Sequence, residues 1–146
     1  MSDFRTLSES VLASPQITPG DIAAAQAEGV TLIVNNRPEG EAEDQTPGTE
    51  IEAAARAAGL DYVAIPIGGA GFGEPQVSAM ADALASAEGK VLAYCRSGTR
   101  STLLWALAQA HSGGDPEEIA AAAAAAGYDV TPVRPAIDML STRARG

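Results

Sequence analysis

Three short apolar runs constrain the fold of this chain more than any other feature of its sequence. They lie at residues 30–34, 61–67 and 91–94, and each is followed by a loop with glycine and then by a segment of helical composition. Short, nearly continuous apolar runs are typical of strands buried on both faces, as in a parallel sheet. The alternation therefore predicts parallel strands joined by helices.

Helix start and stop signals support this alternation. Thr18 and Pro19 suit a cap and a first helical position, and Thr49 and Glu52 have the spacing of a capping box. We expect helices over residues 18–28, 49–58, 74–88, 102–110, 116–126 and 136–143. A further apolar piece at 11–13 predicts an edge strand. The expected fold is one α/β domain over residues 1–146, with three layers: a central, mostly parallel sheet of four to five strands flanked by helices.

Charge and composition argue against several classes of function. The chain has 9 Lys and Arg residues against 19 Asp and Glu, a net charge of −10, which disfavours nucleic acid and acidic membranes as partners. No apolar run approaches the ~20 residues of a membrane span and no leader pattern is visible, so we expect a cytoplasmic protein. One cysteine and one histidine disfavour a metal site. We expect neither a metal nor a cofactor.

The loop after the last apolar run carries the residues best suited to chemistry. Cys95 follows the expected strand, and the next residues are Arg96, Ser97, Gly98, Thr99, Arg100 and Ser101. Such a loop can turn backbone N–H groups and a helix N-terminus toward an anion, and the same field stabilises a thiolate. A lone Cys at a strand end is otherwise a small buried hydrophobe. Because two arginines, a glycine and hydroxyls make a poor core segment, we expect Cys95 to be a nucleophile.

Further residues gather at the same edge of the expected sheet. Ligands bind beyond the carboxyl ends of parallel strands. Three loops leave such ends, at 35–38, 68–74 and 95–100. This places Asn36 and Arg37 near Cys95 as anion-binding candidates, although Arg37 is equally well a surface charge or a loop brace. The glycine-rich loop is either a flexible connector or part of the site.

The pattern Cys-x-x-Gly-x-Arg-Ser after a buried strand resembles the active-site loop shared by cysteine phosphatases and rhodanese-type sulfurtransferases. Further marks are Gln16-Ile17-Thr18-Pro19, Val34-Asn35-Asn36-Arg37-Pro38-Glu39-Gly40-Glu41 and Ala64-Ile65-Pro66-Ile67. Nearly the whole chain resembles the phosphatase-like domain of the bacterial beta-lactamase hydrolase-like proteins, also described as the DUF442 sulfur transferase family. The resemblance implies a dual-specificity-phosphatase-like fold. Members fused to persulfide dioxygenase-like domains imply sulfide oxidation, with a persulfide dioxygenase as a partner.

Two departures from the phosphatase pattern favour sulfur chemistry. Arg100 lies five positions after Cys95, whereas phosphatases of this kind have six, and the shorter count is common in rhodanese-type loops. Gly68 and Gly69 stand where such phosphatases have an acidic proton donor, so Glu74 is the nearest carboxylate. Glu74 also has the simpler interpretation of a helix N-terminal charge. General acid catalysis contributes roughly 10²–10⁴-fold, but sulfite leaves thiosulfate without it.

The sequence thus predicts a sulfurtransferase in which Cys95 takes sulfane sulfur from a small anion, thiosulfate or a persulfide, and passes it to a thiol acceptor. Arg100 and the loop amides would hold the anion, Arg96 would attract it, and Ser101 would donate to the Cys95 sulfur or cap the helix. Two alternatives stay open. One is a phosphatase that forms a cysteinyl-phosphate from a phosphate ester, with Glu74 as acid, and the other is a non-catalytic anion- or persulfide-binding module.

Overall fold

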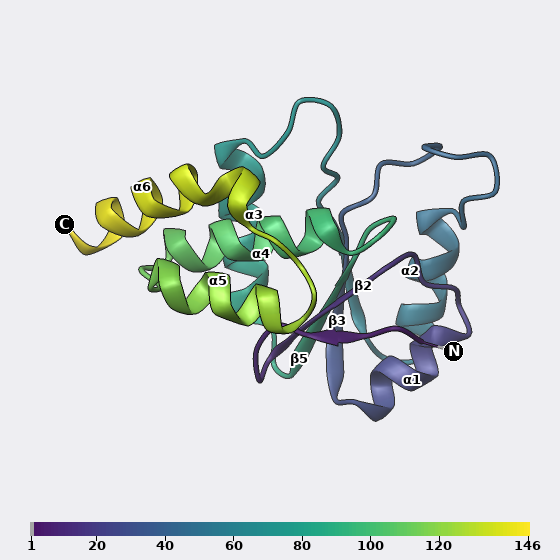
Figure 1. The fold of residues 1–146 in the computed structure, drawn as a ribbon. Coiled ribbons are helices and arrows are strands. Elements are labelled where there is room, and N and C mark those ends of the chain that lie inside the picture. Colours follow the sequence, from purple (N-terminus) through teal and green to yellow (C-terminus); the bar gives the residue numbers. More distant parts are fainter. Residues whose placement is uncertain (1) are drawn as a thin grey trace.

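The computed structural model describes residues 2–146 and contains one five-stranded sheet in the order β1-β2-β5-β3-β4 (Figure 1). The strands are β1 (Arg5–Thr6), β2 (Val11–Ser14), β3 (Val30–Asn35), β4 (Asp61–Ala64) and β5 (Lys90–Tyr94). The helices are α1 (Asp21–Ala27), α2 (Gly48–Ala57), α3 (Glu74–Ser86), α4 (Thr99–His111), α5 (Pro116–Ala125), the 3-10 helix η1 (Thr131–Val133) and α6 (Arg134–Arg145). The pairs β2–β5, β5–β3 and β3–β4 are parallel. The expected mostly parallel sheet is confirmed.

The place of β2 differs from the expectation. The sequence predicts an edge strand at 11–13, but β2 lies between β5 and the short antiparallel strand β1. In β1, Arg5 pairs with Ala13 and Thr6 pairs with Leu12. All four residues of β2 are buried, as expected for a strand with neighbours on both sides. A strand of two residues shows no periodic pattern, which is why the sequence does not reveal β1.

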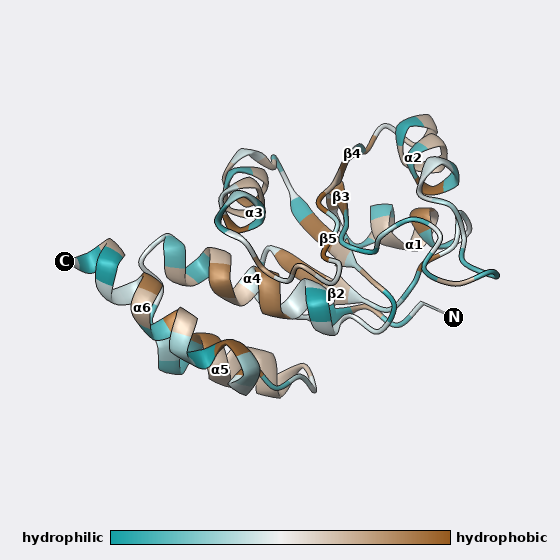
Figure 2. Ribbon diagram, turned by 90° about the horizontal axis from the view of Figure 1, so that it is seen from above, coloured by the Kyte–Doolittle hydropathy of each residue, from teal (hydrophilic) through white to brown (hydrophobic). Residues whose placement is uncertain are grey.

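Helices cover both faces of the sheet (Figure 2). On one face, a core cluster joins Ile22 of α1 and Ile51 of α2 to Ile33 of β3. On the other face, α3 and α4 pack over a cluster that includes Val34 of β3 and Leu104 of α4, and α5 and α6 pack against α4. Adjacent residues of β3 therefore belong to opposite clusters, as in a strand buried on both faces.

Helix α4 is enclosed on nearly all sides. Its buried residues are Ser101, Thr102, Leu103, Leu104, Trp105, Ala106, Leu107, Ala108 and Ala110. A helix that is buried all round needs no amphipathic pattern, and small alanines allow its neighbours to approach closely. Within residues 2–146, no helix is both long and apolar enough to cross a bilayer.

Four of the expected helix starts are wrong: α4 begins at Thr99 and α6 at Arg134, before the expected 102 and 136, and the starts of α1 and α2 also differ. Helix α1 begins at Asp21, whose carboxylate accepts a hydrogen bond of 2.8 Å from the Thr18 N–H, so the Thr18–Pro19 turn precedes the helix. Helix α2 begins at Gly48, and no side chain of its cap residue bonds to it. Glu39, from the preceding loop, accepts a hydrogen bond of 2.9 Å from the Gly48 N–H. A carboxylate nine residues earlier in the chain thus satisfies the start of α2 in place of the expected capping box.

Candidate active site

The carboxyl ends of β3, β4 and β5 meet at one edge of the sheet, and Asn36 ties them together. Its N–H donates to the Tyr94 carbonyl at 2.8 Å, and its carbonyl accepts from the Ile67 N–H at 2.9 Å. Its side-chain amide donates to the Ile65 carbonyl at 2.9 Å, and its Oδ1 accepts from Ser101 Oγ at 2.8 Å. Asn36 has no exposed surface. It therefore fixes the strand ends relative to the start of α4.

These contacts change the expected role of Ser101. The sequence predicts that Ser101 caps the helix or donates to the Cys95 sulfur, but α4 begins at Thr99 and Gly98 is its cap residue. Ser101 lies in the first turn, fully buried, and its hydroxyl donates to Asn36. The polar side chain of Ser101 thus positions α4 against β3.

Asn36→Asp is expected to lower the free energy of unfolding by about 3 kcal/mol or more. A carboxylate oxygen would face the Ile65 carbonyl in a buried place where an amide now donates. Urea unfolding at neutral pH measures the effect. Gln26→Glu makes the same amide-to-acid change at an exposed hydrogen bond to Ala58 and serves as the control. A loss as small as that of the control would contradict the role given to Asn36.

Cys95 directly follows β5, and its side chain has no exposed surface. The Gly98 N–H donates to the Cys95 sulfur over 3.1 Å. Gly98 has φ of +92°, a left-handed conformation that glycine adopts without strain and that turns the chain into α4. Within residues 2–146, no protein acceptor takes the backbone N–H groups of Arg96, Ser97, Arg100 and Ser101. Such groups at a helix N-terminus are suited to bind an anion.

Arg100 is held at the site by Glu41 and Ile67. Its Nη1 and Nη2 donate to the two Glu41 oxygens at 2.8 Å each, and Nη1 also donates to the Ile67 carbonyl at 2.9 Å. The hydrogen bonds to Glu41, together with the nearby Cys95 sulfur, raise the pKa of Arg100. The bonds to Glu41 and Ile67 occupy the outer end of the guanidinium, so the Nε–H and the second Nη2–H remain available for a ligand. These two parallel donors match two oxygens of an oxoanion.

Arg37 is part of the same network. Its Nε donates to Glu41 at 2.9 Å and its Nη1 donates to Gln16 Oε1 at 3.0 Å, with only 5% of the side chain exposed. Its N–H also donates to Asn35 Oδ1. Among the interpretations that the sequence left open, these contacts favour a buried brace that holds Glu41 in place.

The remaining loop residues lie toward solvent. The side chains of Arg96, Ser97 and Thr99 are exposed, and Ser97 Oγ bonds to Thr99 Oγ1 at 3.0 Å. The Arg96 carbonyl accepts from the Gln16 N–H, and the Ser97 carbonyl accepts from the Tyr128 hydroxyl. No group of three or more His, Cys, Asp or Glu side chains that could hold a metal occurs in residues 2–146.

Glu41 is ionised over the whole physiological range. Hydrogen bonds from Arg100 and then Arg37 hold the pKa of Glu41 at about 2, well below its usual value, against the opposing effect of partial burial. Because the folded-state pKa is depressed, this stabilisation is complete above about pH 4.5 and is lost as the pH falls toward 2.

Glu41→Gln is therefore expected to flatten the acid side of the stability curve. The stability lost between about pH 5 and pH 2 should shrink by about 1 kcal/mol, once screening by solvent is allowed for. Urea unfolding at a series of pH values measures this change, with Glu43→Gln as the control on an exposed neighbour. Parallel curves for wild type and Glu41→Gln would contradict the interaction.

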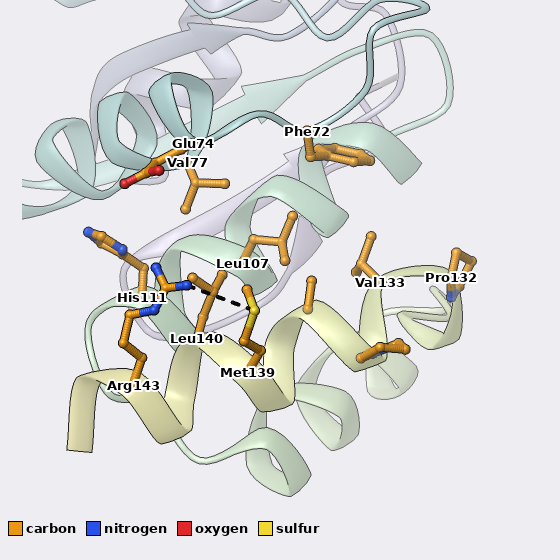
Figure 3. Close-up of a pocket in the computed structure, with 12 residues that line it drawn as sticks. Phe72, Glu74, Val77, Leu107, His111, Pro132, Val133, Met139, Leu140 and Arg143 are labelled. Atoms are coloured by element: carbon orange, nitrogen blue, oxygen red, sulfur yellow. Dashed lines mark hydrogen bonds between the residues drawn. The ribbon is translucent and has the colours of Figure 1, made fainter. Parts of the chain in front are cut away.

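Glu74 lies elsewhere. It lines a cavity of about 420 Å³ between α3, α4 and α6, to which Phe72 of the glycine-rich loop also contributes. Figure 3 shows its carboxylate on the same side of the cavity as His111 and Arg143. His111 is the last residue of α4, about 18 Å along the helix from Thr99. The structure does not bring Glu74 to the Cys95 loop and gives no support to its expected role as an acid there.

The family model described as "Beta-lactamase hydrolase-like protein, phosphatase-like domain" matches residues 3–112. The chain belongs to this family. A beta-lactamase hydrolase-like protein of Agrobacterium fabrum is 36% identical over 107 residues, which are 73% of this chain and 25% of the relative. One of Xylella fastidiosa is 41% identical over 104 residues, 70% of this chain and 24% of the relative. The chain thus spans about a quarter of the length of these family members.

Solved structures show the same fold. A candidate phosphatase of Neisseria meningitidis is 31% identical with a TM-score of 0.83, covering 96% of this chain and 99% of that one. P. aeruginosa TpbA is 18% identical with a TM-score of 0.67, covering 99% and 92%. The fold is that of the dual-specificity phosphatases, as the family resemblance implied.

Sequence reasoning gave no site role to three residues, Gln16, Glu41 and Tyr128, although the first two stand in segments that mark the family resemblance. Glu41 is one of several acids in a loop, so only its spacing of four from Arg37 hints at pairing. Gln16 and Tyr128 reach the site only through the fold, and apart from the family mark that contains Gln16 no signal in the sequence points to them.

Proposed function

We propose that this chain is a sulfurtransferase in which Cys95 carries sulfane sulfur as a persulfide. The observation that carries the proposal is the state of Glu41. This carboxylate is held beside the Cys95 loop by Arg100 and Arg37 with a pKa of about 2, so it has no proton to donate at neutral pH. A site whose neighbouring carboxylate stays ionised favours a leaving group that departs unprotonated, and sulfite is such a group.

The proposed reaction has two displacements. The Cys95 thiolate attacks the outer sulfur of thiosulfate, a new sulfur–sulfur bond forms, and the bond within thiosulfate breaks so that sulfite leaves with the electron pair. The thiolate of a second, acceptor thiol then attacks the terminal sulfur, and the Cys95 thiolate leaves. The free edge of Arg100 and the backbone N–H groups of the loop would bind the oxygens of the donor.

Access to the sulfur requires movement. Because Cys95 has no exposed surface, a donor reaches it only if a neighbouring segment opens. The loop that carries Glu41 holds the site through two arginine side chains rather than through a packed core. This arrangement suits a small anion.

From the family resemblance, a persulfide dioxygenase would consume the persulfide product.

A phosphatase is the second candidate. TpbA, which shares the fold, has been solved in complex with phosphotyrosine. In this reaction Cys95 would form a cysteinyl-phosphate, and an aryl ester would be preferred because a phenolate leaves more readily than an alkoxide without an acid. A binding module without turnover is the third possibility.

Intact-mass measurement of the reduced protein after brief exposure to thiosulfate tests the proposal. Wild type is expected to gain one sulfur atom, which a thiol then removes, whereas Cys95→Ser gains none. Turnover of an aryl phosphate is measured in parallel. Absence of any sulfur adduct, with thiosulfate and with glutathione persulfide, would overturn the proposal. Phosphate release would then support the phosphatase, and no release would leave an anion-binding module.

A further inference from the structure

One peptide unit of the nucleophile loop is held from both sides. The Tyr128 hydroxyl donates to the Ser97 carbonyl at 3.2 Å, and the Gly98 N–H donates to the Cys95 sulfur at 3.1 Å. This carbonyl and this N–H belong to the same peptide bond. In a trans peptide they point in opposite directions, so fixing one of them fixes the other.

We infer that Tyr128 is a positioning residue that locks the Ser97–Gly98 peptide with its N–H toward the Cys95 sulfur. The inference rests on the proposed function, because the N–H would stabilise the thiolate that attacks the donor. Tyr128 is not part of the sequence motif of the loop. It follows α5 and lies beyond the residues 3–112 that the family model matches.

The Ser97–Gly98 peptide has a second possible orientation, flipped by half a turn, which glycine at position 98 makes accessible. Gly98 has φ of +92°. Rotating the Ser97–Gly98 peptide by half a turn would take this angle to about −90°, which is an allowed region for every residue. The flipped peptide would aim the Ser97 carbonyl oxygen at the sulfur and repel a thiolate. The Tyr128 hydroxyl bonds to the carbonyl only in the observed orientation and so opposes the flip.

Tyr128 is itself well placed for this role. The Arg5 guanidinium lies over its ring, 5.3 Å from the centroid, and Arg5 also donates to the Ala126 carbonyl beside it. Partial burial raises the pKa of Tyr128, so its hydroxyl remains a donor throughout the neutral range. A Cβ on Gly98 would collide with the same hydroxyl. Tyr128 thus covers the loop at the one point where a side chain is excluded.

Tyr128→Phe tests the inference because it keeps the ring and removes only the hydroxyl. The thiolate of Cys95 is followed by its ultraviolet absorbance as a function of pH, with Cys95→Ser as the blank, and by alkylation rate. We expect the midpoint of the titration to rise and alkylation below the midpoint to slow by about 3- to 10-fold. Tyr62→Phe removes another half-buried phenol, bonded to Asn35 at 3.0 Å, and is the matched control.

The outcomes separate this inference from the proposed function. If the wild-type midpoint lies near that of a free thiol, about pH 8.5, Cys95 is not activated and the proposed function fails. If the wild-type midpoint is low and Tyr128→Phe matches it, the proposed function stands and the role of Tyr128 is wrong. Gly98→Ala, which favours the flipped peptide and meets the Tyr128 hydroxyl, should raise the midpoint further; an unchanged midpoint there would also contradict the lock.

Discussion

Replacing Cys95 by serine is expected to lower sulfur transfer by about 10⁴-fold or more, since a single nucleophile carries the reaction. A serine hydroxyl does not ionise near neutral pH and forms no persulfide. The fold should persist, because the smaller side chain fits the same enclosed place and its oxygen can accept the Gly98 N–H that now bonds to sulfur. Sulfite release from thiosulfate measures activity, and urea unfolding measures stability.

Cys95→Ala provides the matched comparison. It removes the nucleophile and also the acceptor for the Gly98 N–H, so it should be as inactive as Cys95→Ser and less stable. Sulfite release by Cys95→Ser within tenfold of wild type would show that another group attacks the donor. That result would contradict the central place given to Cys95.

The second large effect is expected for Arg100→Lys, which should lower kcat/KM by about 10²–10³-fold. A lysine keeps the charge but offers donors from a single point. It cannot bond to both Glu41 oxygens and the Ile67 carbonyl and still present two parallel N–H groups to an anion. The loss should fall on both kcat and KM, because the same edge would bind the donor and the departing sulfite.

Initial rates over a range of thiosulfate concentrations measure this loss. Arg134→Lys is the matched control, because Arg134 likewise bonds to carboxylates, those of Asp138 and Glu117, but on the outer surface of the molecule. It should leave the rates unchanged. If Arg100→Lys kept more than a third of the wild-type kcat/KM, charge alone would be sufficient and the fork geometry would not matter.

The parallel part of the fold could be predicted from the sequence because its signals are local. The strands β3 and β5 are apolar runs, and glycines stop several helices, so the alternation alone placed Asn36 and Cys95 at one edge. Strand β1 and the true start of α2 could not be predicted. A two-residue pairing and a cap from Glu39 depend on segments that meet only after folding.

The candidate site divides in the same way. The composition of the loop from Cys95 to Ser101 is enough to predict a site. The side chains that hold this loop in place come from three distant segments. Glu41 approaches from the loop after β3, Gln16 from the loop after β2, and Tyr128 from the turn after α5. Glu74 was expected as the proton donor because it is the nearest carboxylate in the sequence after Gly68 and Gly69. In the structure it lies at the start of α3 and lines another cavity.

The enclosure of α4 has a consequence for how the loop can move. The helix is packed against the sheet, α3, α5 and α6, so its amides should exchange with solvent deuterium only when the whole domain unfolds. The C-terminal side of the nucleophile loop, where α4 begins, therefore cannot open locally. The segment that carries Glu41 has an exposed backbone and few apolar contacts, so its amides should exchange orders of magnitude faster. One side of the site, formed by α4, is therefore rigid, and the side formed by the segment that carries Glu41 can open.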